Sequence, residues 1–186
     1  MRKDFIKYSI ITLSLIVFFV SGSIAQDKQK GIDAVKKGDY VTGLKILQSV
    51  VKTDDSYEAN LFYALALSQT GSLKEAEVYY KKALEDDDEG IDAFRGLGDI
   101  KTELKDFSSA ESYYKKALKI EQTNVPVLVS LAEMYLLQGK IDKGIELLTN
   151  AEVNSPSDVN ILVALGNAYY ERETWALAKQ YFDKAL

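Results

Sequence analysis

The sequence predicts an all-α protein built from repeated helical hairpins, and three observations support this. The segment AEVYYKKAL, which begins at Ala76, returns 34 residues later as AESYYKKAL, which begins at Ala110. Apolar residues recur at helical spacing on both sides of a break within each stretch of this length. Small residues also return at fixed places in the stretch. Self-similarity at this period is typical of a solenoid, in which neighbouring repeats bury each other's apolar faces.

The repeat divides the chain into units, each expected to form a helix, a tight turn and a second helix. The expected units are a degenerate hairpin over 26–56, repeats over 57–90, 91–124 and 125–158, and an incomplete repeat over 159–186. Position 15 of a unit falls at the break, where Gly71 and Gly139 suit the left-handed residue that ends many helices. Lys105 and Glu173 occupy that position in the other two repeats. Because a left-handed residue other than glycine costs roughly 1–2 kcal/mol, we expect those two turns to be looser.

Small residues at positions 8 and 20 predict where the two helices of a hairpin cross. Position 8 is Ala64, Gly98, Ala132 and Gly166. Position 20 is Ala76, Ala110, Gly144 and Ala178. The large residue at position 24 is expected to fill the space beside the crossing, and the alanine at position 27 to let the next unit approach. Position 24 is a tyrosine in two repeats, and we expect tyrosines to pack on helix faces with the hydroxyl reaching solvent.

These positions resemble the tetratricopeptide repeat. FRGLG from Phe94 and LVALGNAYY from Leu162 are similar to the first half of that family's motif, W-x2-L-G-x2-Y, and positions 20 and 24 match its A-x3-F. The resemblance covers 57–186 and implies a right-handed superhelix that binds a protein or peptide. It also implies that positions 2, 5, 9, 12 and 13 of each unit line a concave groove. The candidate groove residues carried over by alignment are Leu61, Leu65, Gln69, Asp92, Arg95, Asp99, Glu103, Glu133, Leu137, Asn167 and Tyr170.

The candidate groove residues suggest the chemistry of the partner. The family's best-known mode clamps a carboxylate with Lys and Asn, but only Arg95, Asn160 and Asn167 are of that kind here, so the clamp looks absent. The groove combines apolar ends with acidic residues in the middle. We therefore expect an extended or helical peptide with basic and apolar side chains.

Composition excludes most catalytic chemistry and argues against nucleic acid. The 186 residues include no Cys and no His, which removes thiolate nucleophiles, disulfides, imidazole metal ligands and Ser-His-Asp triads. The formal net charge of −5 is the wrong sign for a nucleic-acid binder. The acidic run 85–89 lacks the Glu at the twelfth position of a calcium loop, so we expect a solvated turn. Asp99 and Glu103 stand one helical turn apart, but a repeat face supplies neither the walled pocket nor the two different environments of a catalytic carboxylate pair, so we expect a structural role. No cofactor or metal is predicted.

The first residues predict export. Arg2, Lys3 and Lys7 precede a short apolar run that ends in small residues, as in a secretory signal peptide over 1–25. Ser23 and Ala25 would direct cleavage before Gln26. The apolar run is short of the roughly 20 residues that a membrane-spanning helix needs, although an uncleaved anchor stays the competing interpretation. The expected location is the periplasm or the exterior of a bacterial cell, with membrane contact only if the segment is retained.

The sequence therefore predicts a non-catalytic adaptor or scaffold in the cell envelope. The alternative is a docking or regulatory arm of a larger enzyme or sensor whose active domain lies beyond residue 186. The last helix is expected to expose Trp175, Phe182, Ala185 or Leu186, which favours either further residues downstream or a partner chain on that face.

Overall fold

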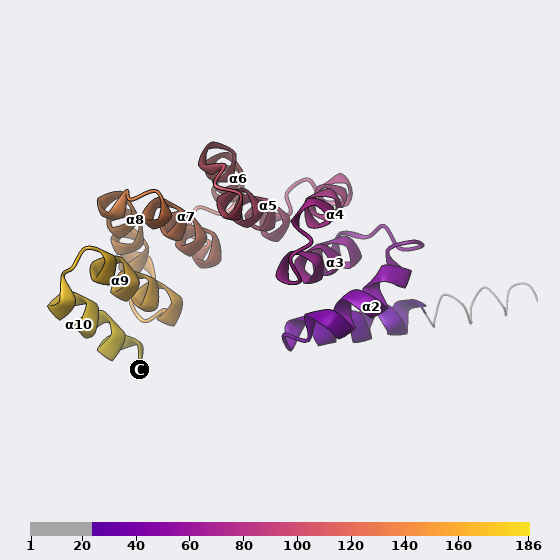
Figure 1. The fold of residues 1–186 in the computed structure, drawn as a ribbon, viewed down its shortest axis with the longest axis horizontal. Coiled ribbons are helices and arrows are strands. Elements are labelled where there is room, and N and C mark those ends of the chain that lie inside the picture. Colours follow the sequence, from indigo (N-terminus) through magenta and orange to yellow (C-terminus); the bar gives the residue numbers. More distant parts are fainter. Residues whose placement is uncertain (1–23) are drawn as a thin grey trace, which may run out of the picture. The chain divides into compact units, whose positions relative to one another are not determined.

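The computed structural model describes residues 24–186, which form two compact units that meet in sequence at Asp86 and Asp87 (Figure 1). All regular structure within this range is α-helical. The predicted signal peptide lies outside the described residues, apart from Ile24 and Ala25, which are helical. Among the helices in the described range, none has the length and apolarity needed to cross a bilayer.

The first unit is a pair of helical hairpins. Residues 24–36 are helical and precede α2 (Tyr40–Val50), and α3 (Tyr57–Gln69) then pairs with α4 (Leu73–Asp86). Helix α3 packs on both α2 and α4. The core of the first unit contains Ile32 and Leu47 from the first hairpin, and neither side chain is accessible to solvent.

The second unit consists of three further hairpins. These pair α5 (Ile91–Glu103) with α6 (Phe107–Ile120), α7 (Val125–Leu137) with α8 (Ile141–Asn154), and α9 (Val159–Glu171) with α10 (Trp175–Ala185). Consecutive hairpins pack through α6 on α7 and α8 on α9, while the first helices α5, α7 and α9 contact one another in that order. Two neighbouring clusters of buried side chains run through the unit and share Leu118 and Leu147 at their margins.

Short polar side chains begin most of these helices. Asp39, Ser56, Asp106, Asn124 and Asp158 each accept a hydrogen bond from a backbone N–H in the first turn of the helix that follows. Such caps satisfy N–H groups that have no partner inside the helix. Asp106 is therefore a helix cap whose side chain accepts from the Ser109 N–H at 3.2 Å, rather than a freely substitutable turn residue.

The turns inside the hairpins share one geometry whether or not they contain glycine. Gly71 and Gly139 have φ of 86° and 73°, and Lys105 and Glu173 have φ of 59° and 61°. At Lys105 the next N–H, that of Asp106, donates to the Lys101 carbonyl at 2.8 Å. The equivalent hydrogen bonds at the turns of Gly71, Gly139 and Glu173 measure 2.8 to 2.9 Å. The expectation of looser turns at Lys105 and Glu173 is therefore wrong, because the six-to-one bond that closes the helix end holds a non-glycine residue left-handed as well.

Contacts at the glycines locate the helix crossing. A Cβ on Gly144, at position 20, would lie 3.2 Å from the Ala132 carbonyl oxygen, so positions 8 and 20 do face each other. Position 24 lies directly over position 8, because a Cβ on Gly98 would stand 2.5 Å from the Tyr114 ring, and one on Gly166 would stand 2.4 Å from the Phe182 ring. The large side chain thus fills the place that a Cβ at position 8 would take.

The last helix is partly uncovered. Trp175 is 55% exposed and Leu186 is fully exposed, as expected from the sequence. Phe182 is only half-exposed, because its ring packs on Gly166 within the same hairpin. Of the four residues named in that expectation, Phe182 is therefore covered from one side by its own repeat.

Candidate peptide-binding face

The first helices of the second unit present most of the candidate groove residues. Asp92, Arg95, Asp99 and Glu103 recur every three or four residues along α5 and so share one of its faces. Glu133 and Leu137 lie on α7, and Asn167 and Tyr170 on α9. Since α7 packs between α5 and α9, we call this surface the first-helix face and define it by these eight residues.

Asp99 lies in a hydrogen-bond network with the hairpin core. The Tyr114 hydroxyl donates to Asp99 Oδ1 at 2.8 Å and lies 3.1 Å from the Thr102 hydroxyl. The Ser130 side chain of α7 acts on this carboxylate as well, and it favours a lower pKa for Asp99. The expectation that tyrosine hydroxyls reach solvent is wrong for Tyr114, which is 1% exposed. Its hydroxyl instead orients the Asp99 carboxylate through the hydrogen bond that it donates.

Arg95 is the basic residue of the first-helix face. Its two terminal nitrogens lie 3.3 Å from Asp92 Oδ1 and 3.4 Å from Asp99 Oδ2. Its Nε is buried without a hydrogen-bond partner. One guanidinium is therefore shared between two carboxylates at the long end of ion-pair distances, and it does not neutralise both.

The carboxylate pair that interacts across repeats is Asp99 with Glu133. Burial raises the pKa of Asp99 despite opposing hydrogen bonds and the Arg95 charge. Burial and the negative charge of Asp99 both raise the pKa of Glu133. The Asp99 side chain is nevertheless 39% exposed. Both observations fit a carboxylate that protein surrounds on most sides and that water still reaches.

Exposed apolar side chains lie beside these acids. Leu137 at the end of α7 is 68% exposed, and Tyr170 and Val163 on α9 are 55% and 37% exposed. The Tyr170 ring meets Trp175 edge-to-face with centroids 4.8 Å apart. Exposed apolar side chains that lie together on one face are typical of an interaction surface.

The remaining candidates belong to the first unit. Leu61 and Leu65 are half-buried on α3, and Gln69 is exposed at the end of that helix. Near the start of α3 a depression is lined by Asp55, Asn60, Lys82, Glu85 and Asp86. Asn60 is completely buried and donates from Nδ2 to the Asp55 and Ser56 carbonyls at 2.9 and 3.2 Å. It thereby closes the loop before the helix, which is a structural role.

The acidic run forms an exposed turn, as expected. Helix α4 ends at Asp86, whose carboxylate accepts a hydrogen bond from the Tyr57 N–H at 2.6 Å, and residues 85–89 are exposed. Within residues 24–186 no cluster of three or more His, Cys, Asp or Glu side chains is arranged to hold a metal ion.

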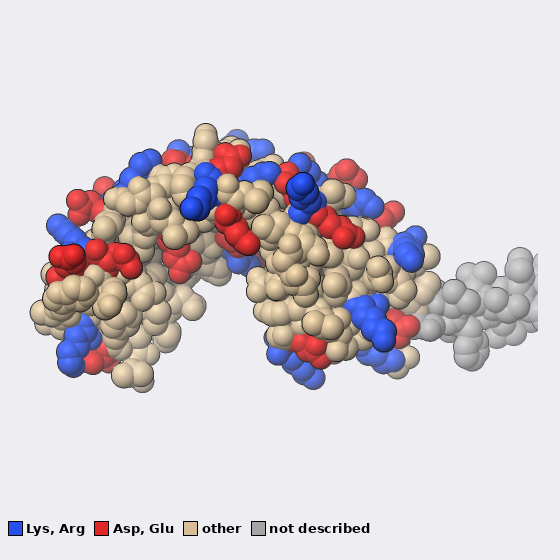
Figure 2. All heavy atoms as spheres, in the orientation of Figure 1, with Lys and Arg blue, Asp and Glu red and all other residues tan. Residues whose placement is uncertain are grey.

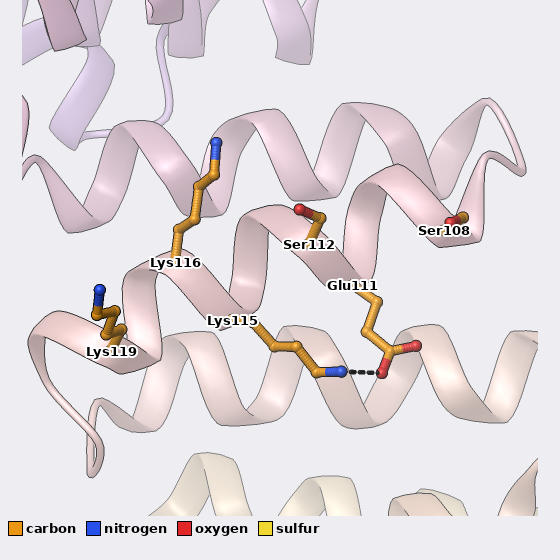
Figure 3. Close-up of a pocket in the computed structure, with 6 residues that line it drawn as sticks. All are labelled: Ser108, Glu111, Ser112, Lys115, Lys116 and Lys119. Carbon is orange, nitrogen blue, oxygen red and sulfur yellow. Dashed lines mark ion pairs between the residues drawn. The ribbon is translucent and has the colours of Figure 1, made fainter.

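A second depression lies on the outer surface of α6 (Figure 3). Its lining consists of Ser108, Glu111, Ser112, Lys115, Lys116 and Lys119. Lys115 pairs with Glu111 at 2.7 Å, and Lys116 lies over the Phe94 and Tyr113 rings. Figure 2 shows basic and acidic side chains interspersed over the second unit. Since one helix supplies the whole lining and part of its charge is already paired, this depression offers less to a ligand than the first-helix face.

Sequence reasoning missed two residues of the site. They are Tyr114, whose hydroxyl donates to Asp99, and Ser130, whose side chain favours a lower pKa for Asp99. The available signal for Tyr114 was its place at position 24, which lies over position 8 and therefore beside the neighbouring Asp99. Ser130 could not be found this way, because its contact depends on how α7 packs on α5.

Comparison with known proteins agrees with this architecture. Tetratricopeptide repeat family profiles match residues 28–91 and 130–186, and another profile of the same description matches 101–152. A TPR repeat-containing protein of Methanocaldococcus jannaschii is 30% identical over 174 residues, which cover 85% of this chain and 29% of that relative.

Solved structures show the same fold at low sequence identity. The Pseudomonas aeruginosa PilF structure matches with a TM-score of 0.70 and 18% identity, over 87% of this chain and 74% of that one. A crystal structure of MamA matches with a TM-score of 0.64 and 22% identity, over 88% of this chain and 90% of that one. The repeat profiles, the relative and the hairpin geometry lead to one conclusion: the chain belongs to the tetratricopeptide repeat family.

Proposed function

We propose that this protein is a non-catalytic scaffold of the cell envelope whose first-helix face binds an extended protein segment with basic and apolar side chains. Tetratricopeptide repeats typically serve as protein-interaction scaffolds. One observation carries the proposal: acidic and exposed apolar side chains lie on the same face. Glu133 has no ion pair among the described residues, and the negative charge of Asp99 acts on it. Leu137 and Tyr170 on the same face are exposed. A basic group there would gain two carboxylates, and an apolar neighbour would cover exposed side chains.

Site-specific photo-crosslinking tests the binding surface. A photoreactive amino acid replaces Asn167 on the first-helix face or, as a matched control, Asn150, which is exposed on α8. In cells that produce the full chain, we expect position 167 to yield a discrete crosslinked partner that position 150 does not. Equal or stronger crosslinking at position 150 would show that the first-helix face is not the binding surface.

Export is the second part of the proposal. It rests on the basic start, the apolar run and the small residues before Gln26. Intact-mass analysis of the protein from the envelope fraction is expected to give a chain that begins at Gln26. A mass that retains residues 1–25 would favour the anchored form.

The alternative function is a docking arm of a larger protein. It is favoured by the relative from Methanocaldococcus jannaschii, of whose length this chain spans only 29%. In that case the first-helix face would bind a substrate or regulator of the larger protein. Sequencing the gene beyond the codon for Leu186 distinguishes a repeat scaffold from an arm joined to another domain.

A further inference from the structure

We propose that the first-helix face selects a segment in the polyproline II conformation with Lys or Arg at one position and an apolar residue three positions away. This inference rests on the proposed function and specifies the partner's conformation and spacing. The basic residue lies between α5 and α7, and the apolar residue between α7 and α9.

The spacing follows from the order of the helices. Helices α5, α7 and α9 pack in sequence, and packed helices lie about 8–10 Å apart. A polyproline II segment rises about 3.1 Å per residue with three residues per turn, so every third residue faces the same side about 9 Å further on. A β-strand of the same length points residues three apart to opposite sides. One polyproline II turn therefore matches one repeat of the face.

The place between α5 and α7 suits a cation. Asp99 and Glu133 occupy the same position in adjacent repeats, on helices α5 and α7 that pack together, and the negative charge of Asp99 raises the pKa of Glu133. Arg95 is divided between Asp92 and Asp99, and Glu133 has no ion pair among the described residues. With these groups ionised, Asp92, Asp99 and Glu133 carry three negative charges, and Arg95 carries one positive charge. A Lys or Arg side chain from the partner would reduce this excess of negative charge.

The place between α7 and α9 suits an apolar side chain. Leu137 and Tyr170 are exposed near the ends of these two helices, whereas α5 carries the charged Glu103 at the repeat position that Leu137 occupies on α7. Asn167 occupies the position of Asp99 and Glu133 in its repeat but carries an amide. Because a polyproline II backbone makes no internal hydrogen bonds, its carbonyl groups can accept from this amide. The face thus changes from charged to apolar within a single helix spacing.

A series of proline-based peptides tests the spacing. Each peptide carries one Arg and one Leu separated by two, three or four positions in both orders, and its affinity for the full chain is measured by fluorescence anisotropy. We expect one order of the three-position spacing to bind at least about fivefold more tightly than the other spacings, since only it engages both places at once. Equal affinity across the spacings would overturn the proposal.

Charge exchange tests where the basic residue lies. Glu133→Lys is expected to weaken the Arg peptide at least fivefold and to strengthen a peptide with Glu in place of Arg. The control Glu146→Lys makes the same change on an exposed position of α8 and should alter neither affinity. Circular dichroism of both variants establishes that they are folded. Unchanged affinity of Glu133→Lys for both peptides would contradict the assigned place.

The two proposals fail in distinguishable ways. If position 167 crosslinks a partner but the peptides show no dependence on spacing, the face binds proteins and the polyproline II inference is wrong. If position 167 gives no crosslink while position 150 does, the proposed binding surface itself is wrong.

Discussion

Two adjacent positions of the repeat behave in opposite ways. Position 8 is Gly98, Ala132 and Gly166 in the three hairpins of the second unit, always small and buried. The next residue along each helix is Asp99, Glu133 and Asn167, which lies on the first-helix face and changes in charge from one repeat to the next. Position 8 is limited by the helix that packs on it, whereas Glu133 and Asn167 at the next position are exposed.

The difference teaches that fold and recognition are encoded separately within the same helices. At the crossing, a Cβ on Gly98 or Gly166 would lie within 2.5 Å of an aromatic ring. Close packing therefore requires a small residue at position 8. On the first-helix face Glu133 and Asn167 are exposed, so packing limits the size of their side chains less. Substitutions at the crossing should therefore change stability, and substitutions on the face should change binding.

The largest expected effect is at the crossing. Ala110 is fully buried at position 20, opposite Gly98 in register, and Ala110→Leu should lower the free energy of unfolding by about 1–3 kcal/mol through overpacking. Denaturant unfolding monitored by circular dichroism measures it. An unchanged midpoint would mean that positions 8 and 20 do not meet in α5 and α6.

A smaller loss is expected at the helix cap. Asp106→Leu removes the bond from the Ser109 N–H to the Asp106 carboxylate and should cost about 1 kcal/mol. The same unfolding experiment applies, with Ser108→Ala as a control on the exposed start of α6. Substitution at a plain surface position usually costs less than about 0.5 kcal/mol. A loss that small in Asp106→Leu would show that the cap contributes little.

The left-handed turns predict a gain. Lys105→Gly relieves a φ of 59° and should raise the free energy of unfolding by up to about 1 kcal/mol, because glycine adopts this conformation without the Cβ clash. The reverse change, Gly71→Ala at a φ of 86°, should lower it by a similar amount. If both variants unfold at the wild-type midpoint, the turns carry no backbone strain.

The smallest effect is electrostatic and depends on pH. The raised pKa of Glu133 means that the folded state holds more protons than the unfolded state as pH rises above 4.5, so ionisation of Glu133 lowers stability in that range. Glu133→Gln removes this penalty. Allowing for the exposure of the side chain, we expect a gain of a few tenths of a kcal/mol at pH 7 relative to wild type. The gain should vanish near pH 4, and a gain that is constant across pH would point to packing instead.

Much of the fold could be predicted because the same pattern of residues occurs in each repeat. Residue size at positions 8, 20 and 24 returns in each unit, and helical spacing with a break at position 15 predicts the hairpins. Less could be predicted about the turns. The sequence shows that Lys105 and Glu173 are not glycine, but the hydrogen bonds that hold them left-handed depend on the closed helix ends.

The candidate face could be predicted only as a set of positions. Its electrostatics depend on contacts between repeats, such as Ser130 with Asp99 and Asp99 with Glu133, and the spacing of residues within one helix cannot reveal them. Asp99 and Glu103 were the obvious pair in the sequence. The structure adds Glu133 on the next first helix, and the negative charge of Asp99 raises the pKa of this residue.

The separation of fold from recognition is tested most directly by measuring stability and binding on the same two variants. Ala110→Leu should shift the denaturant midpoint, while its remaining folded fraction binds the Arg-x-x-Leu or Leu-x-x-Arg peptide, whichever order the wild type prefers, with near wild-type affinity. Glu133→Lys should leave the free energy of unfolding within about 0.5 kcal/mol of the wild-type value. The same variant should lower the affinity for that peptide at least fivefold. A loss of stability in Glu133→Lys as large as that in Ala110→Leu, or an unchanged peptide affinity, would contradict the account.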